Sequence, residues 1–236
     1  MRSSLMPRAT DKESQIHSDW HMASMISIER ISAELDTDRS IWTAVEDICC
    51  RTGDGGDPIP TERWELFARI WIEPYRVLMP EWSYVALADR RVVGYLTGCP
   101  DTARFARMCF VRCTLPLLRQ IAFGRYRGDA YGERFARQAL RLENSAERSF
   151  PKPIRRQLPR QFPAHLHMNV EADFRRGGVG IRLIERFVKD LQQRRISGVH
   201  LFCGAAPVPF YTRMGFSELA VVPVRGYPVY AMVRRL

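Results

Sequence analysis

The stretch AHLHMNVEADFRRGGVG, residues 164–180, decides the fold predicted for this chain. Its first seven residues alternate, so that Leu166, Met168 and Val170 share one face of a predicted strand and polar side chains share the other. A glycine-rich turn follows, and after it an apolar stripe recurs at helical spacing up to about residue 195. The stretch therefore predicts a strand, a turn and a helix in direct succession.

The turn RRGGVG, residues 175–180, has the composition of an anion-binding loop. Its glycines leave backbone N–H groups open at the start of a helix, where the helix dipole favours negative charge, and two arginines add full charges. The turn lacks the GK[ST] ending of a P-loop and the GxGxxG spacing of a dinucleotide fold. Phosphate binding and a simple tight connection between strand and helix both remain open.

The polar face of the predicted strand carries His165, His167, Asn169 and Glu171. A central strand with parallel neighbours is normally covered on both faces, so this polar row predicts a cleft, with an ordinary solvated face as the alternative. An imidazole starts with a pKa near neutrality, which suits it to accept a proton from an amine.

The remaining pattern predicts a mixed α/β sheet. Downstream, a strand at 198–203 should run parallel to 164–170, followed by a short helix at 206–214 and strands at 216–222 and 227–236. Upstream, a strand at 26–31 precedes helices at 38–50 and 61–73, for which Asp38 and Thr61 are the predicted caps and Pro74 the predicted end. A hairpin follows at 82–98, turning at Asp89 and Arg90.

Residues 101–163 are predicted to form a basic helical insertion between two strands. Residues 104–162 hold 14 Lys/Arg and four Asp/Glu, an excess of ten that equals the net charge of the whole chain. Two helices are expected, at 104–123 with Pro116 ending or kinking it and at 131–150, before an extended proline-spaced run at 150–163. Such a surface suits an anionic ligand or partner, although a solvated arginine-rich helix face would look the same.

The spacing R-x-x-G-x-G, after a strand and before an amphipathic helix, resembles the acetyl-CoA pyrophosphate loop of the GNAT superfamily of N-acetyltransferases. The resemblance is good over 164–236, weak over about 25–100 and absent from the insertion. Within the superfamily, AHLH together with VPFYTRMGF is most similar to the arylalkylamine N-acetyltransferases and to the acetyltransferase-like domain associated with O-GlcNAcase. It implies the GNAT fold, a mixed central β-sheet that is antiparallel in its N-terminal part, has a parallel splayed pair in the middle and is flanked by helices.

The resemblance also implies residue roles. His165 and His167 would remove the proton of an acceptor amine, and Tyr211 would protonate the leaving thiolate of coenzyme A. The cofactor would be held by Met168, Asn169 and Val170 along its arm and by Arg175, Arg176, Gly177, Gly178, Val179 and Gly180 at its pyrophosphate.

This chain departs from the family pattern in two places. Gly204 stands where many relatives carry an asparagine, and the spacing between AHLH and the turn is one residue shorter than in the arylalkylamine enzymes. If the missing residue falls within the strand, the histidines turn away from the cleft and Glu171 and Asp173 become the alternative bases.

These observations predict an acetyl-CoA-dependent N-acetyltransferase that acts on a primary amine of a small molecule or peptide. A non-catalytic acyl-CoA-binding module and a nucleic-acid-binding protein acting through the insertion are the alternatives. We expect a disordered tail at 1–22 and one domain at 23–236, a possible homodimer, free cysteines and no metal site. The chain shows no secretory signal or membrane-spanning stretch, which favours a cytoplasmic protein without membrane contact.

Overall fold

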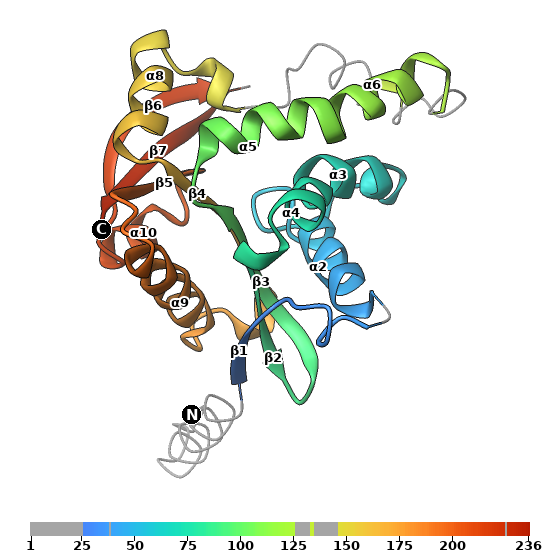
Figure 1. Ribbon diagram of the computed structural model, residues 1–236, viewed down its shortest axis with the longest axis horizontal. Coiled ribbons are helices and arrows are strands. Elements are labelled where there is room, and N and C mark those ends of the chain that lie inside the picture. Colours follow the sequence, from blue (N-terminus) through green and yellow to red (C-terminus); the bar gives the residue numbers. More distant parts are fainter. Residues whose placement is uncertain (1–25, 38, 126–132, 135–145, 225) are drawn as a thin grey trace, which may run out of the picture.

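The computed structural model describes residues 26–37, 39–125, 133–134, 146–224 and 226–236. In these ranges a sheet of seven strands forms the centre of the molecule, in the order β1-β2-β3-β4-β5-β7-β6 (Figure 1). All neighbouring strands are antiparallel except β4 and β5, which are parallel. This confirms the predicted mixed sheet, whose strands are β1 (Ile26–Arg30), β2 (Ser83–Ala88), β3 (Arg91–Cys99), β4 (Ala164–Val170), β5 (Gly198–Cys203), β6 (Ser217–Val224) and β7 (Tyr227–Arg235).

Strands β4 and β5 separate soon after they meet. Their register consists of two pairs, Ala164 with Val199 and His165 with His200. Beyond His165, β4 continues to Val170 and stays paired with β3 along its other edge. The predicted parallel splayed pair is therefore present, and it opens after His165.

Helices cover both faces of the sheet (Figure 1). Helix α9 (Val179–Gln193) lies on one face, and its predicted apolar stripe is buried there. Helices α2 (Ser40–Arg51), α3 (Trp64–Trp71) and α4 (Glu73–Leu78) lie on the other face, where α2 packs against Val85 and Tyr95. The short helix α10 (Val208–Arg213) follows β5.

Gly98 allows α9 to approach the sheet closely. A Cβ atom at this position would lie 2.6 Å from the carbonyl oxygen of His165 and 2.6 Å from Cζ of Phe187 on α9. Because the first of these atoms is backbone, Gly98→Ala should lower the free energy of unfolding by about 2 kcal/mol through overpacking. The urea midpoint tests this against Gly204→Ala, where an added Cβ meets nothing within 4 Å. Equal midpoints for the two variants would contradict this account of the packing.

The hairpin and most helices occur where they are predicted, but their ends differ. Asp89 and Arg90 form the hairpin turn, both with positive φ. The predicted cap at Thr61 is wrong, since Thr61 begins a 3-10 turn (Thr61–Arg63) and the N-cap position of α3 is held by Arg63. Pro74 does fall where the helix breaks, and it occupies the first turn of α4, where its missing N–H costs nothing. The predicted cap Asp38 lies outside the described residues.

The insertion begins with one long helical rod (Figure 1). Helix α5 (Thr102–Cys109) passes through a π-helical turn (Phe110–Thr114) into α6 (Leu115–Ala122). Of the two predicted outcomes, Pro116 does not end the helix, because it falls in the first turn of α6, directly after the π turn. Most of the second predicted helix lies outside the described residues.

The predicted extended run at 150–163 is wrong. Helix α8 (Lys152–Gln161) occupies it, with Pro151 preceding the helix and Pro153 in its first turn, two positions that tolerate proline. Burial of Leu158 and Phe162 against Val233 of β7 provides the packing that the local sequence did not reveal. Tertiary contacts thus override the proline spacing.

Candidate functional site

The polar face of β4 points toward α3, α4 and α5, and its apolar face points toward α9. His165, His167 and Asn169 lie opposite Cys99, Thr97 and Tyr95 of β3, whereas Leu166, Met168 and Val170 join the core that includes the α9 stripe. The predicted alternation along the strand is therefore present in the structure. Since the histidines meet rings from α3, α4 and α5, the shortened spacing has not turned them toward α9.

His165 uses both of its ring nitrogens in contacts within the protein. Nε2 lies 2.8 Å from the hydroxyl of Tyr75, and Nδ1 lies 2.8 Å from Oγ1 of Thr102. Burial, with smaller contributions from the neighbouring His200 and His167, lowers the pKa of His165 to about 3. The imidazole is therefore neutral and fully engaged.

His167 has a different environment. Its ring lies between Trp71 of α3 and Tyr95 of β3, with centroid distances of 5.6 Å and 5.7 Å. Its Nδ1 atom is buried and has no hydrogen-bond partner among the described residues. Burial lowers the pKa of His167 to about 4, so this imidazole is also neutral at physiological pH. Of the two histidines, His167 is the one with a ring nitrogen left for a ligand or a water.

The two alternative bases lie beyond the end of β4. Glu171 follows the end of β4, and its buried carboxylate pairs with Arg51 at 2.9 Å and with Arg91. Asp173 is exposed on the 3-10 turn Ala172–Phe174. The carboxylate of Glu171 thus neutralises two arginines and is poorly placed to accept a proton from an amine.

The predicted phosphate loop forms the N-terminus of α9. Gly178 has a φ of 79° and is the N-cap residue, a left-handed conformation that favours glycine. Gly178 has no side chain with which to cap α9, so the N–H groups at the start of this helix suit an anion. Val179 is buried, and Gly180 lies against Phe210 and Met168, where a Cβ atom would approach Phe210 to 3.1 Å.

The two arginines of this loop differ. Arg175 donates from Nε to the carbonyl oxygen of Val170 at 3.0 Å and from Nη2 to that of Gly56 at 3.2 Å. It therefore braces the loop against β4 and against the turn that follows α2. Arg175, Arg176 and Gly177 are all exposed, so both guanidinium groups are accessible, and Arg175 is the one already held by two carbonyl oxygens.

Tyr211 lies on α10 beside the end of β5, the strand that diverges from β4. Its ring is buried between Phe210 and Phe216, at centroid distances of 5.2 Å and 5.6 Å. Burial, together with nearby Cys203, raises the pKa of Tyr211 well above its ordinary value, and burial raises the pKa of the Cys203 thiol to about 11. The phenol therefore keeps its proton and can donate it.

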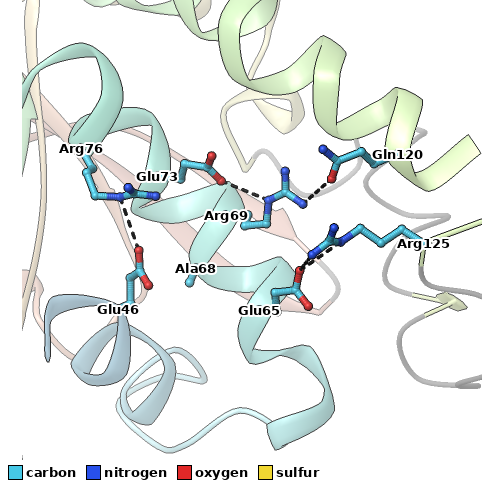
Figure 2. Close-up of a pocket in the computed structure, with 8 residues that line it drawn as sticks. All are labelled: Glu46, Glu65, Ala68, Arg69, Glu73, Arg76, Gln120 and Arg125. Carbon is cyan, nitrogen blue, oxygen red and sulfur yellow. Dashed lines mark hydrogen bonds and ion pairs between the residues drawn. The ribbon is translucent and has the colours of Figure 1, made fainter. Parts of the chain in front are cut away.

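A hollow of about 310 Å³ lies between α2, α3, α4 and α6, and none of the predicted site residues lines it (Figure 2). Its charges are joined in pairs, with Arg69 bound to Glu73 at 3.1 Å and to Gln120 at 2.7 Å. The lining residues are Glu46, Glu65, Ala68, Arg69, Glu73, Arg76, Gln120 and Arg125. They come from separate segments, so no local motif could have indicated the hollow.

Three buried histidines make the fold sensitive to acid. Burial lowers the pKa of His165 to about 3 and those of His167 and His200 to about 4, whereas an unfolded chain titrates near the ordinary value of 6.5. The unfolded state therefore binds more protons below pH 6.5, and the stability present above that pH is lost as the pH falls toward 4. Each histidine should therefore lower the free energy of unfolding at pH 5 by about 2 kcal/mol relative to neutral pH.

Urea unfolding at pH 7.5 and pH 5.0 measures this loss. His200 hydrogen-bonds the carbonyl oxygen of Phe162 through Nδ1, and an asparagine amide can replace that donor. His200→Asn should therefore show a smaller drop between the two pH values than the wild type. A wild-type stability that is constant over this range would contradict the assignment of neutral, buried histidines.

The described residues contain no helix long and apolar enough to span a bilayer, and no cluster of side chains arranged to bind a metal ion.

Comparison with known proteins supports the same architecture, although no family model matches the chain. The structure is similar to that of SsHAT, with 28% sequence identity, a TM-score of 0.66 and coverage of 89% of this chain and 98% of that one. It is also similar to a GCN5-related N-acetyltransferase from Kribbella flavida (16%, TM-score 0.50, coverage 90% and 99%). A third similar structure is a polyamine N-acetyltransferase from Drosophila melanogaster, an enzyme that catalyses the formation of N-acetylagmatine. It has 14% sequence identity and a TM-score of 0.52, and the match covers 89% of this chain and 100% of that one. The predicted similarity to the arylalkylamine and O-GlcNAcase-associated members stays a prediction.

Proposed function

We propose that this chain, which has the fold of the GNAT superfamily of N-acetyltransferases, transfers an acetyl group from acetyl-CoA directly to a primary amine. The observation that carries the proposal is the splay of β4 from β5 after His165, with His167 on one diverging strand and Tyr211 just after the other. Such a wedge brings two reactants together between a proton acceptor and a proton donor.

The chain has groups that suit each part of the cofactor. The uncapped N-terminus of α9, with Gly177, Gly178 and Gly180 and the exposed Arg176, suits a diphosphate. The β4 backbone from Met168 to Val170 has no β5 partner in the register, so it can pair with an extended amide-containing arm. Acetyl-CoA would supply an activated acyl group attached to a good leaving thiol.

Each proton transfer has a residue in the proposal. An alkylamine is mostly protonated at neutral pH and has no lone pair with which to attack. His167 is neutral and has an unpartnered nitrogen, so it can accept this proton directly or through a water. Tyr211 keeps its proton because burial raises its pKa, and it can give that proton to the thiolate as the thiolate leaves.

The transfer assay follows release of the coenzyme A thiol with a panel of amines, polyamines, amino sugars and peptide N-termini. We expect amine-dependent thiol release, with acetylated product detected by mass spectrometry in equal amount. Thiol release without acetylated amine would indicate hydrolysis, and no release with any acceptor would contradict the proposed transfer.

A non-catalytic acyl-CoA-binding module is the second candidate, and Gly204 favours it. Many relatives place an asparagine there that contacts the cofactor arm, and an added Cβ at Gly204 would meet nothing within 4 Å. Acetyl-CoA binding without turnover for any acceptor would support this candidate.

A further inference from the structure

His165 joins several segments of the chain at one point. It contacts Tyr75 of α4 and Thr102, the first residue of α5, and its Nδ1 lies 3.2 Å from the thiol of Cys99 at the end of β3. Its ring lies 5.9 Å from that of His200 on β5. Two helices and three strands therefore meet around one imidazole.

The hydrogen bonds around His165 fix its tautomer. Both the backbone N–H and the hydroxyl of Thr102 donate to the carbonyl oxygen of Pro163, each at 2.7 Å. Because the Thr102 hydroxyl has used its hydrogen, Nδ1 of His165 must donate to Thr102. Nε2 then accepts from the hydroxyl of Tyr75. A second proton on the ring would leave the hydrogen of that tyrosine unpaired in a buried position.

This network lies where the splay begins. His165 is the last β4 residue that pairs with β5 in the register, and the strand beyond it pairs only with β3. His167 follows two residues later on the same face of β4. The position of His165 therefore determines where β4 leaves β5 and how the following residues are presented.

We propose that His165 is a positioning residue, which as a neutral Nδ1–H imidazole clamps β4 to α4 and α5 and so sets the opening that receives acyl-CoA. This inference rests on the proposed function, and it replaces the prediction that both histidines accept the amine proton. His165 has no ring nitrogen free for that role, whereas His167 has one. Tyr75, Thr102 and the carbonyl of Pro163 are the partners that hold the clamp.

Thr102→Val tests the clamp without altering a histidine. The valine keeps the shape of threonine and removes the oxygen that accepts from His165, so the Kd and KM for acetyl-CoA should rise about tenfold while kcat stays within about threefold. Thr102→Ser restores the hydroxyl and should restore both constants. Thr43→Val is the matched control, because Thr43 makes its hydroxyl hydrogen bond to a backbone carbonyl on the exposed surface of α2.

Calorimetry with acetyl-CoA measures Kd independently of turnover, and thermal denaturation shows that each variant is folded. The pH profile separates positioning from proton transfer, since Thr102→Val and Tyr75→Phe should leave its acid limb in place. An unchanged acetyl-CoA Kd in Thr102→Val would overturn this inference and leave the proposed function standing. So would a His165→Asn variant that keeps the wild-type Kd but has a lower kcat and a pH profile without its acid limb. A wild-type protein that does not bind acetyl-CoA would instead remove the proposed function, and the inference with it.

Discussion

Tyr211→Phe is expected to lower kcat about 100-fold, because it removes the only proton that this ring can give to the leaving thiolate. The acetyl-CoA affinity should stay within about twofold of the wild type, since the ring packing between Phe210 and Phe216 does not involve the hydroxyl. Steady-state kinetics with a saturating amine, together with calorimetric titration of acetyl-CoA, measures both quantities on the same preparation.

Tyr227→Phe provides the control, because Tyr227 is 75% exposed on β7 and its hydroxyl has no role in the proposed chemistry. If the two tyrosine variants had equal kcat values, Tyr211 would not be the proton donor. A large loss of acetyl-CoA affinity in Tyr211→Phe would assign the hydroxyl to binding.

His167→Gln is expected to lower kcat/KM for the amine about 100-fold at pH 7, because it removes the neutral imidazole that accepts the amine proton. The loss should shrink as the pH rises toward the pKa of the amine, since an amine that is already deprotonated needs no base. In the wild type, His167 should stay neutral, and so able to accept a proton, down to a pH of about 4, because burial lowers its pKa to about 4.

The pH series of kcat/KM for wild type and variant, measured with one amine of known pKa, makes this comparison. A ratio that stays constant from pH 6 to pH 10 would show that His167 contributes by shape or polarity and does not accept the proton. Trp71 and Tyr95 contact the ring on both sides, so the fold of the variant should be checked by its urea midpoint.

The central part of the fold could be predicted because its information is local. The alternation from Ala164 to Val170 gives the strand and its two faces, and the stripe that begins at Val179 gives the helix behind it. Glycines at 177, 178 and 180 mark the turn between them. Each of these signals lies within one element, where the backbone period dictates the pattern.

The rest depends on contacts between distant segments. Tyr75 and Thr102 lie 90 and 63 residues before His165, and nothing in AHLH indicates that both nitrogens of that ring are occupied. Helix α8 depends on burial of Leu158 and Phe162 against β7, and Arg175 is directed to the carbonyl of Gly56, 119 residues away. The expected extended run does not match the structure at α8, and the proposed positioning role of His165 rests on contacts that the local sequence does not reveal.

Calorimetric titration of the purified protein with acetyl-CoA tests the central claim most directly. The comparison is with Arg175→Ala/Arg176→Ala, which removes two charges from the loop before α9, and with Lys189→Ala/Arg195→Ala, which removes two charges toward the far end of that helix. The account predicts a Kd of about 1–10 μM for the wild type, about tenfold weaker binding for the first variant and little change for the second. The account would be contradicted if the wild type showed no binding at about millimolar acetyl-CoA. A Kd of about 1 mM corresponds to a binding free energy of only about 4 kcal/mol.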